Sequence, residues 1–388
     1  MHVEALFVDD HLEDLHHLLH AVSQARLDWH VRTAASGEEA LAMLQLQLAD
    51  VVISDMRMPG MDGGVLLNLV RQHYPSAVRL ILSAEGGVRG FMRATSAAHQ
   101  VLSKPCDVRL LQRVVEETLH FQARLRAPEL VDAMHQLGPL PSLPRISQKL
   151  EERLRDEYAT LNEVATLVSA DPAIVARVLQ IANSSYFRRG SEVLDMQTAV
   201  SRLGFELIRS LVLTRELYAL LPSNSTAHAE VQHDNEVAVQ ISEVACFIAG
   251  KQANQRELLT VSVLCNVGKL LRLMLPVPVP GNLPDALIGA YLLSLWGLPF
   301  RLVQSVAFVD EPASLMTDRA DLDALPSAVL IHLARCLFSR LKRAPDAVPR
   351  WGAEEELDQR LLAHVDSLQL QAWEDGLRRR ADQSRGDN

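Results

Sequence analysis

Residues 51–64 read VVISDMRMPGMDGG, and this stretch decides how the first part of the chain is interpreted. A run of Val and Ile ends in Asp55 and passes into a loop that contains a proline and three glycines. An apolar, β-branched run that is closed by turn residues predicts a buried strand. The strand therefore brings one carboxylate, that of Asp55, to the edge of a sheet.

Similar apolar runs recur before and after this stretch, at residues 5–10, 29–34, 78–84 and 100–105. Segments with helical periodicity separate them, at residues 37–45 behind Ser36 as N-cap, 63–74, 87–98 and 107–119, and from about Leu12. Five strands that alternate with five helices predict an α/β fold, a flavodoxin-like doubly wound five-stranded parallel sheet. The near-continuous apolar strands are typical of a sheet covered on both faces.

Polar residues stand where the predicted strands end, and in such sheets ligands bind beyond the carboxyl ends of the strands. These residues are Asp9, Asp10, Asp55, Ser83 and Lys104. Three clustered carboxylates repel one another unless a cation shares the site, and oxygen ligands favour Mg²⁺. Lys104 and Ser83 suit an incoming phosphoryl group, one as a point charge and the other as a hydroxyl donor. The pattern predicts an aspartate that accepts phosphate.

These residues, with the Met-Pro-Gly-Met-Asp-Gly loop and the Leu-Ser-Lys-Pro run at 102–105, resemble the receiver domain of two-component response regulators. The resemblance implies that Asp55 takes a phosphoryl group from a sensor histidine kinase, with Ser83 and Lys104 contacting that group. It implies a cis peptide bond before Pro105. The Mg²⁺ ligands that it implies are Asp9 through water, Asp10, Asp55 and the backbone carbonyl of Arg57.

Two features bear on how a phosphorylated receiver would act. Val101 stands where the family often has an aromatic switch residue, three positions before Lys104, so we expect the usual readout to be weakened or rerouted. Arg57 and Glu85 would overhang the site, and as a pair they would screen the acyl phosphate from water. Two exposed charges of little energetic consequence are the alternative interpretation.

Beyond Pro128 the strand signal stops and helical periods continue to about residue 372. One clear helix begins with Asp171 as its cap and Pro172 at its first position. We therefore predict a multi-helix bundle behind the sheet. The predicted domains are a phosphoacceptor domain at 1–122, a helical linker at 123–133, a helical domain at 134–372 and a disordered tail at 373–388.

Several separated signatures in the helical part resemble the HDOD domain, a metal-poor relative of HD-type phosphohydrolases. They occur in order at residues 137–150, 165–187, 199–213, 233–238, 264–271 and 288–299. Catalytic relatives hold metal ions with a His, a His-Asp pair and a later His pair. The matching positions in this chain are His233, Cys265, Asn266, Val309 and Asp310.

Of these positions, His233 and Asp310 alone suit a metal ion, because Asn266 is a weak neutral ligand and a buried thiol such as that of Cys265 is more often a core residue. Two ligands do not hold a metal that activates water, which normally takes three. The five positions are therefore predicted to be metal-free. We expect no cofactor and no catalysis in the helical domain, which would act by contact with another protein.

Composition limits the other functions. The net charge is -10 and no segment forms a basic footprint, which argues against nucleic-acid binding. No apolar run is long enough to span a bilayer and no secretory signal is evident, so we expect a cytoplasmic protein without membrane contact. A receiver-regulated HD-type phosphodiesterase or phosphohydrolase acting on a cyclic dinucleotide or a nucleotide is the main alternative, and a DNA-binding transcription regulator is the second. The downstream partner and a homodimer are left open.

Overall fold

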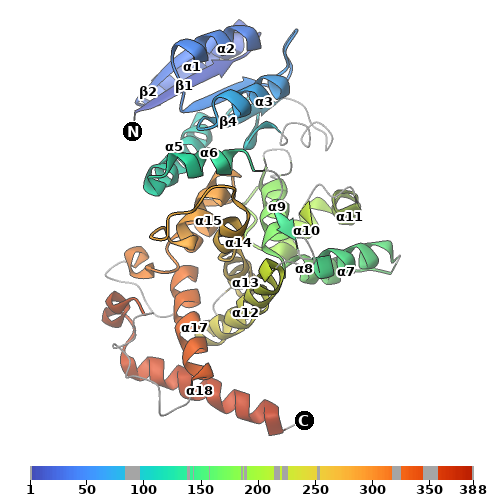
Figure 1. Cartoon of the computed structure of the whole chain (residues 1–388), viewed down its shortest axis with the longest axis vertical. Coiled ribbons are helices and arrows are strands. Elements are labelled where there is room, and N and C mark those ends of the chain that lie inside the picture. The colour runs from blue at the N-terminus through green and yellow to red at the C-terminus, as the bar shows by residue number, and fades with distance from the viewer. Residues whose placement is uncertain are drawn as a thin grey trace.

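The computed structural model describes residues 2–83, 97–137, 140–142, 144–156, 158–184, 187, 190–213, 219–220, 226–250, 254–316, 325–343 and 357–386. Its N-terminal part is a five-stranded parallel sheet in the order β2-β1-β3-β4-β5 (Figure 1). The strands are β1 (Val3–Val8), β2 (Trp29–Ala34), β3 (Val51–Asp55), β4 (Val78–Ser83) and β5 (Gln100–Ser103). The predicted fold class is confirmed.

The helices of this part are α1 (Leu12–Gln24), α2 (Gly37–Leu46), α3 (Gly63–His73) and α5 (Val108–Leu125). Ser36 caps α2 as predicted, because its hydroxyl accepts a hydrogen bond from the backbone nitrogen of Glu39. The fourth predicted helix, at 87–98, falls almost entirely outside the described residues. β1 and β3 are buried along nearly their whole length, as strands with helices on both faces must be.

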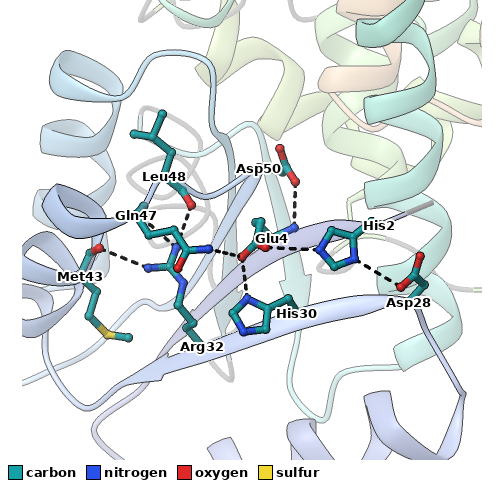
Figure 2. Close-up of polar contacts among 9 residues, drawn as sticks. All are labelled: His2, Glu4, Asp28, His30, Arg32, Met43, Gln47, Leu48 and Asp50. Carbon is teal, nitrogen blue, oxygen red and sulfur yellow. Dashed lines mark hydrogen bonds and ion pairs between the residues drawn. The ribbon is translucent and has the colours of Figure 1, made fainter.

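The edge strand β2 is tied to the neighbouring elements by polar contacts (Figure 2). Arg32 donates to the carbonyl oxygens of Met43, Gln47 and Leu48, at and just beyond the end of α2. Glu4 accepts from the ring of His30, with 2.7 Å between Oε2 and Nδ1. A positively charged side chain at the end of a helix is favourable, since the last carbonyls lack partners within the helix.

The remainder of the chain is mostly helical. Its elements are α6 (Pro128–His135), β6 (Pro141–Ser142), α7 (Pro144–Arg155), α8 (Leu161–Val168), α9 (Pro172–Asn183), α10 (Met196–Leu203), α11 (Phe205–Leu213), β7 (Ala219–Leu220), α12 (Thr226–Ala249), α13 (Gln255–Leu264), α14 (Val267–Met274), α15 (Asp285–Leu295), α16 (Phe300–Ala307), η1 (Pro312–Leu315), α17 (Ser327–Lys342), η4 (Gln359–Ala363) and α18 (Ser367–Gly386). The short parallel pair β6–β7 was not predicted, because two-residue strands leave no periodicity in the sequence. Within the described residues, no helix is both long and apolar enough to cross a membrane.

The predicted start of α9 is confirmed. Asp171 accepts from the backbone nitrogens of Ala173 and Ile174, and Pro172 stands at the first helical position. At the other end of α9, Asn183 donates to the carbonyl of Val193 and accepts from its backbone nitrogen. An amide that satisfies backbone groups on both sides fastens the end of the helix to the following segment.

The prediction of a disordered tail at 373–388 is wrong for its described residues, because α18 continues to Gly386. Glu374 on this helix is buried and pairs with Arg340 of α17, with 2.9 Å between Oε2 and Nε. Arg378 contacts the same carboxylate at 2.7 Å. The partner of Glu374 lies 34 residues earlier, so the local composition gave no sign of this pairing.

Candidate functional site

The polar residues predicted to meet at one edge of the sheet stand at the carboxyl ends of its strands. Asp9 and Asp10 follow β1, Asp55 ends β3, Ser83 ends β4 and Lys104 follows β5. β1 and β3 are direct neighbours in the parallel sheet, as are β3 with β4 and β4 with β5. Parallel strands that end together place their last side chains at one edge, so residues 95 positions apart in sequence become neighbours.

Lys104 is the centre of this edge. Its Nζ lies 2.5 Å from Asp55 Oδ1, 2.6 Å from Asp9 Oδ2 and 2.9 Å from Asp14 Oδ2. Burial would lower the pKa of Lys104, but the hydrogen bonds to the three carboxylates outweigh it and raise the pKa above its ordinary value. Asp14, which sequence reasoning missed, comes from the first turn of α1, and its bond to Lys104 lowers its own pKa.

The other acidic residue, Asp10, carries a buried oxygen, Oδ1, that accepts no hydrogen bond from the described part of the chain. The His11 ring nitrogen Nδ1 lies 3.2 Å from that oxygen without bonding to it, and the ligand atoms of Asp9, Asp10 and His11 lie within 4.8 Å of one another. A buried carboxylate oxygen without a donor is unfavourable, and a hard divalent cation would satisfy it. The acidic Asp9–Asp10 cluster is therefore consistent with the Mg²⁺ site that receivers have. His11 was not predicted.

The loop after β3 holds the Asp55 carboxylate in place. The backbone nitrogen of Arg57 donates to Asp55 Oδ2 at 2.5 Å, so the backbone of Arg57, whose carbonyl was predicted to bind metal, runs beside Asp55. A side chain at Gly63 would bring its Cβ within 2.0 Å of the Asp55 carbonyl oxygen, which makes glycine necessary there. Asp62 caps α3 through the backbone nitrogen of Val65. The loop thus folds back tightly against Asp55.

Ser83 ends β4, and Val101 lies in β5, the strand that Lys104 follows. Ser83 is half-buried, and its carbonyl accepts from the backbone nitrogen of Lys104 at 3.0 Å. The peptide bond between Lys104 and Pro105 is cis, as predicted. Val101 is buried in β5. Ala84, next to Ser83, and Glu85, the proposed partner of Arg57, lie outside the described residues.

The HD-like positions of the helical domain are arranged differently. His233 is exposed on α12. Asn266, between α13 and α14, donates to the carbonyl of Asp234 at 3.0 Å and to Asn235 Oδ1 at 3.2 Å. The Asp234 carboxylate is 3.0 Å from Lys269 Nζ. The side chain of Asn266 therefore acts as a donor that ties two helices together.

Cys265 and Asp310 lie within electrostatic reach of each other. Burial raises the pKa of the Cys265 thiol to about 11, with Arg335 lowering it and Asp310 raising it. Asp310 is paired with Arg335, with 3.1 Å between Oδ1 and Nη1. Val309 is buried and its carbonyl lies 2.9 Å from His332 Nδ1. The structure thus brings Cys265 near Asp310, with Arg335 as the neighbouring cation.

Comparison with known protein families matches both parts of the chain. Residues 5–116 match the response regulator receiver domain and residues 140–277 match the HDOD domain. Over 92 residues the chain is 36% identical to the DNA-binding transcriptional regulator NtrC of Salmonella typhimurium, covering 23% of this chain and 20% of that protein. The chain spans roughly a fifth to a third of the length of the curated relatives it matches first.

Two solved structures are similar to the N-terminal part. The signal receiver domain of an HD domain-containing protein from Pseudomonas fluorescens Pf-5 is 29% identical, covering 32% of this chain and 99% of that one, with a TM-score of 0.30. The chemotaxis response regulator CheY4 of Vibrio cholerae is 32% identical, covering 29% of this chain and 98% of that one, with a TM-score of 0.27.

The two family matches follow one another along the chain, and the first contains the carboxylates that surround Lys104. The order of the matches is the order predicted from the sequence, with the sheet first and the helical part second. The chain is a two-component response regulator with an N-terminal receiver domain and a C-terminal HDOD domain.

Proposed function

We propose that Asp55 accepts a phosphoryl group from a sensor histidine kinase in a Mg²⁺-dependent reaction. The observation that carries this proposal is the position of Lys104, whose Nζ lies within 2.9 Å of the carboxylates of Asp9, Asp14 and Asp55 at the carboxyl edge of the sheet. A receiver domain has a cognate histidine kinase as its donor, and in this arrangement the Asp55 carboxylate is the nucleophile that attacks the donor's phosphoryl group.

In this reaction an oxygen of Asp55 forms a bond to phosphorus as the phosphorus–nitrogen bond of the kinase phosphohistidine breaks, and the leaving imidazole takes up a proton. Lys104 would exchange a carboxylate partner for a phosphoryl oxygen, and Ser83 would donate its hydroxyl to another. The backbone nitrogen of Arg57 holds the Asp55 carboxylate in position. Asp10, Asp55 and the carbonyl of Arg57, with Asp9 through water, would hold Mg²⁺, which would supply positive charge to the phosphoryl group.

Replacement of the phosphoacceptor tests the proposal. We expect Asp55→Asn to abolish labelling by acetyl phosphate or by a histidine kinase in a phosphate-affinity gel, and Asp28→Asn to label like the unaltered protein. Asp28 is an exposed receiver aspartate that contacts His2 and lies away from the edge. Labelling of Asp55→Asn at the normal rate and stoichiometry would refute the assignment.

The output is proposed to be contact with a downstream protein, without catalysis by the HDOD domain. Three of the positions that bind metal in catalytic relatives carry Cys265, Asn266 and Val309, and the Asn266 amide donates two hydrogen bonds. A receiver-regulated HD-type phosphodiesterase is the alternative. Metal analysis of the purified full chain distinguishes them: about one equivalent of a transition metal, bound tightly through chelator dialysis, would favour the enzyme.

A further inference from the structure

Arg79 is a buried arginine without an acidic partner. The residue is 2% exposed, and among the described residues no carboxylate contributes to its electrostatics. Burial lowers its pKa to about 9, so the guanidinium stays charged at neutral pH. Its donors go to backbone carbonyls, with Nε 3.1 Å from Ala97 and Nη2 2.7 Å from His135. A buried charge held in this way is costly to leave without acceptors.

The carbonyl of His135 is the last one of α6, the helix that connects the two domains. The end of a helix carries partial negative charge, so Arg79, near the start of β4, caps α6. The ring of His99 lies beside it, with Nδ1 3.1 Å from the Arg79 backbone nitrogen and Nε2 2.6 Å from Nη2. Nη1 of Arg79 lies 3.4 Å from the Ala77 carbonyl, so each nitrogen of the guanidinium has a carbonyl acceptor and the His99 ring packs beside the cap.

A second contact of the same kind joins β5 to the HDOD domain. Gln100, the first residue of β5, is buried, and its Nε2 lies 3.0 Å from the Ser294 carbonyl and 3.3 Å from that of Leu295. These are the last two residues of α15. Gly297, at a φ of +74°, closes the helix so near that an added Cβ would lie 2.5 Å from Gln100 Oε1. Figure 1 shows α6 and α15 next to the receiver, beside α5.

The other ends of the same two strands carry residues of the phosphorylation site. β4 runs from near Arg79 to Ser83, and β5 runs from Gln100 to the residue before Lys104. Arg79 and Ser83 are four residues apart, as are Gln100 and Lys104, and four residues span about 13 Å along a strand. The two strands are paired throughout this length, from Leu80 with Gln100 to Ser83 with Ser103. A shift at the carboxyl edge therefore has a short, hydrogen-bonded route to the domain contact.

We propose that β4 and β5 couple phosphorylation to the HDOD domain through a latch, defined as the contacts of Arg79 with α6 and of Gln100 with α15, which phosphorylation loosens. This inference rests on the proposed function of Asp55. In the structure, Lys104 is bound to carboxylates and the latch is closed. A phosphoryl group draws Ser83 and Lys104 toward itself, and paired strands pass that displacement on to Arg79 and Gln100.

The latch has the properties of a two-state element. Hydrogen bonds weaken steeply with distance and angle, so a small displacement at the end of a strand is enough to break them. This route also suits a receiver with Val101 in place of the usual aromatic switch, since it uses the opposite end of the sheet.

Linkage fixes the direction of the test. If phosphorylation loosens the latch, then removing the latch must strengthen binding of a phosphoryl analogue by the same factor. Gln100→Leu removes two neutral hydrogen bonds at nearly constant size. At about 0.5 to 0.7 kcal/mol for each bond, we expect the full chain with Mg²⁺ to bind beryllofluoride about five- to tenfold more tightly.

The experiment measures beryllofluoride affinity by fluorine NMR, and hydrogen exchange at the amides of 295–298, in the full chain. In the unaltered protein we expect beryllofluoride to increase exchange at these amides. In Gln100→Leu, exchange should be high from the start and change little. Gln112→Leu is the matched control, since Gln112 lies on α5 and bonds to Glu116 of the same helix.

A second pair of variants tests Arg79. Arg79→Met should also tighten beryllofluoride binding, whereas Arg32→Met should not, although Arg32 donates to carbonyls at the end of a helix in the same way (Figure 2). The α2 end that Arg32 caps lies inside the receiver. Both variants therefore remove an arginine that donates to carbonyls at a helix end. Arg79→Met does so at the contact between the domains, and Arg32→Met does so within the receiver.

Two results would overturn the latch: an affinity in Gln100→Leu within twofold of the unaltered protein, or an equal gain in Gln112→Leu. The second would assign the coupling to α5, whose Thr118 Oγ1 lies 3.4 Å from Ser294 Oγ. Lack of any beryllofluoride occupancy in the unaltered protein would overturn the assignment of Asp55, and the latch with it. Occupancy without a change in exchange would overturn the latch alone.

Discussion

The receiver and the HDOD domain each contain a polar centre where relatives bind metal, and the two centres differ in how their charges are balanced. In the receiver, Lys104 is shared by the carboxylates of Asp9, Asp14 and Asp55, and among the described residues a buried oxygen of Asp10 has no donor. Negative charge is left over. A site with excess negative charge favours binding of a divalent cation.

In the helical part of the chain, two described acidic groups near the matching positions are each paired with a cation. Asp234 pairs with Lys269, and Asp310 pairs with Arg335. Asn266, at the position of a metal-binding aspartate, is neutral and donates to neighbouring oxygens. The comparison teaches that the sign of the leftover charge, more than the presence of acidic residues, separates a cation site from a structural one.

Removing the shared cation of the receiver should give the largest effect. We expect Lys104→Met to slow phosphorylation by acetyl phosphate about 100-fold, because the phosphoryl oxygens lose their cationic partner in a partly dry site. Labelling over time in a phosphate-affinity gel measures it. Lys269→Met, which removes a cation from the HDOD centre, should leave the rate unchanged, and a loss below about threefold in Lys104→Met would break the comparison.

Restoring an acidic residue to the HDOD centre should be the next largest effect. Asn266→Asp turns a donor into an anion that faces the Asp234 carbonyl and Asn235 Oδ1, so we expect a loss of about 2 kcal/mol in stability at neutral pH. Chemical denaturation measures it, with the exposed Asn282→Asp as control. Tight binding of a transition metal by Asn266→Asp, without loss of stability, would contradict our description of this centre.

A carboxylate between the two domains should show a smaller, pH-dependent effect. Burial raises the pKa of Glu117 on α5 to about 7; Arg113 opposes this shift and Glu192 adds to it. Because the pKa in the folded protein lies above that of the unfolded chain, the stability from neutral Glu117 is complete below about pH 4.5 and lost as the pH rises through about 7.

Relative to the unaltered protein, Glu117→Gln should therefore gain on the order of 1 kcal/mol in stability between pH 5 and pH 8. Denaturation midpoints at the two pH values measure the gain. Glu116→Gln, on the same helix, serves as control. An identical pH dependence in the Glu117 variant and the unaltered protein would show that this carboxylate is ionised at both pH values.

The smallest effect is expected at the exposed ion pair of the HDOD centre. Asp310 and Arg335 are 54% and 33% exposed, so Asp310→Asn should cost no more than about 0.5 kcal/mol. Thermal unfolding with and without salt measures it. A loss several times larger would mean that this pair, like the receiver centre, depends on its charges for its structure.

Much of the receiver could be predicted from the sequence, because its signals are local. Apolar runs mark the strands, and the polar residues predicted for the site stand at the ends of these runs, so the parallel order of the sheet brings Asp9, Asp55 and Lys104 to one edge. The helical domain was predictable in class for the same reason, as was the Asp171 cap of α9. These features depend on the periodicity of short segments.

The tertiary structure decided the contacts between segments far apart in the chain. Asp14 joins Lys104 across 90 residues, and Gln100 meets Ser294 across 194. Glu374 pairs with Arg340 and so holds α18 against α17, in a segment for which composition predicted disorder. Such pairs produce no periodicity and no motif in the sequence. Their partners become necessary only when folding removes both groups from water. The sequence by itself therefore determined the strands of the main sheet, the helical class of the rest and the acidic edge, and the tertiary structure decided how the two domains meet.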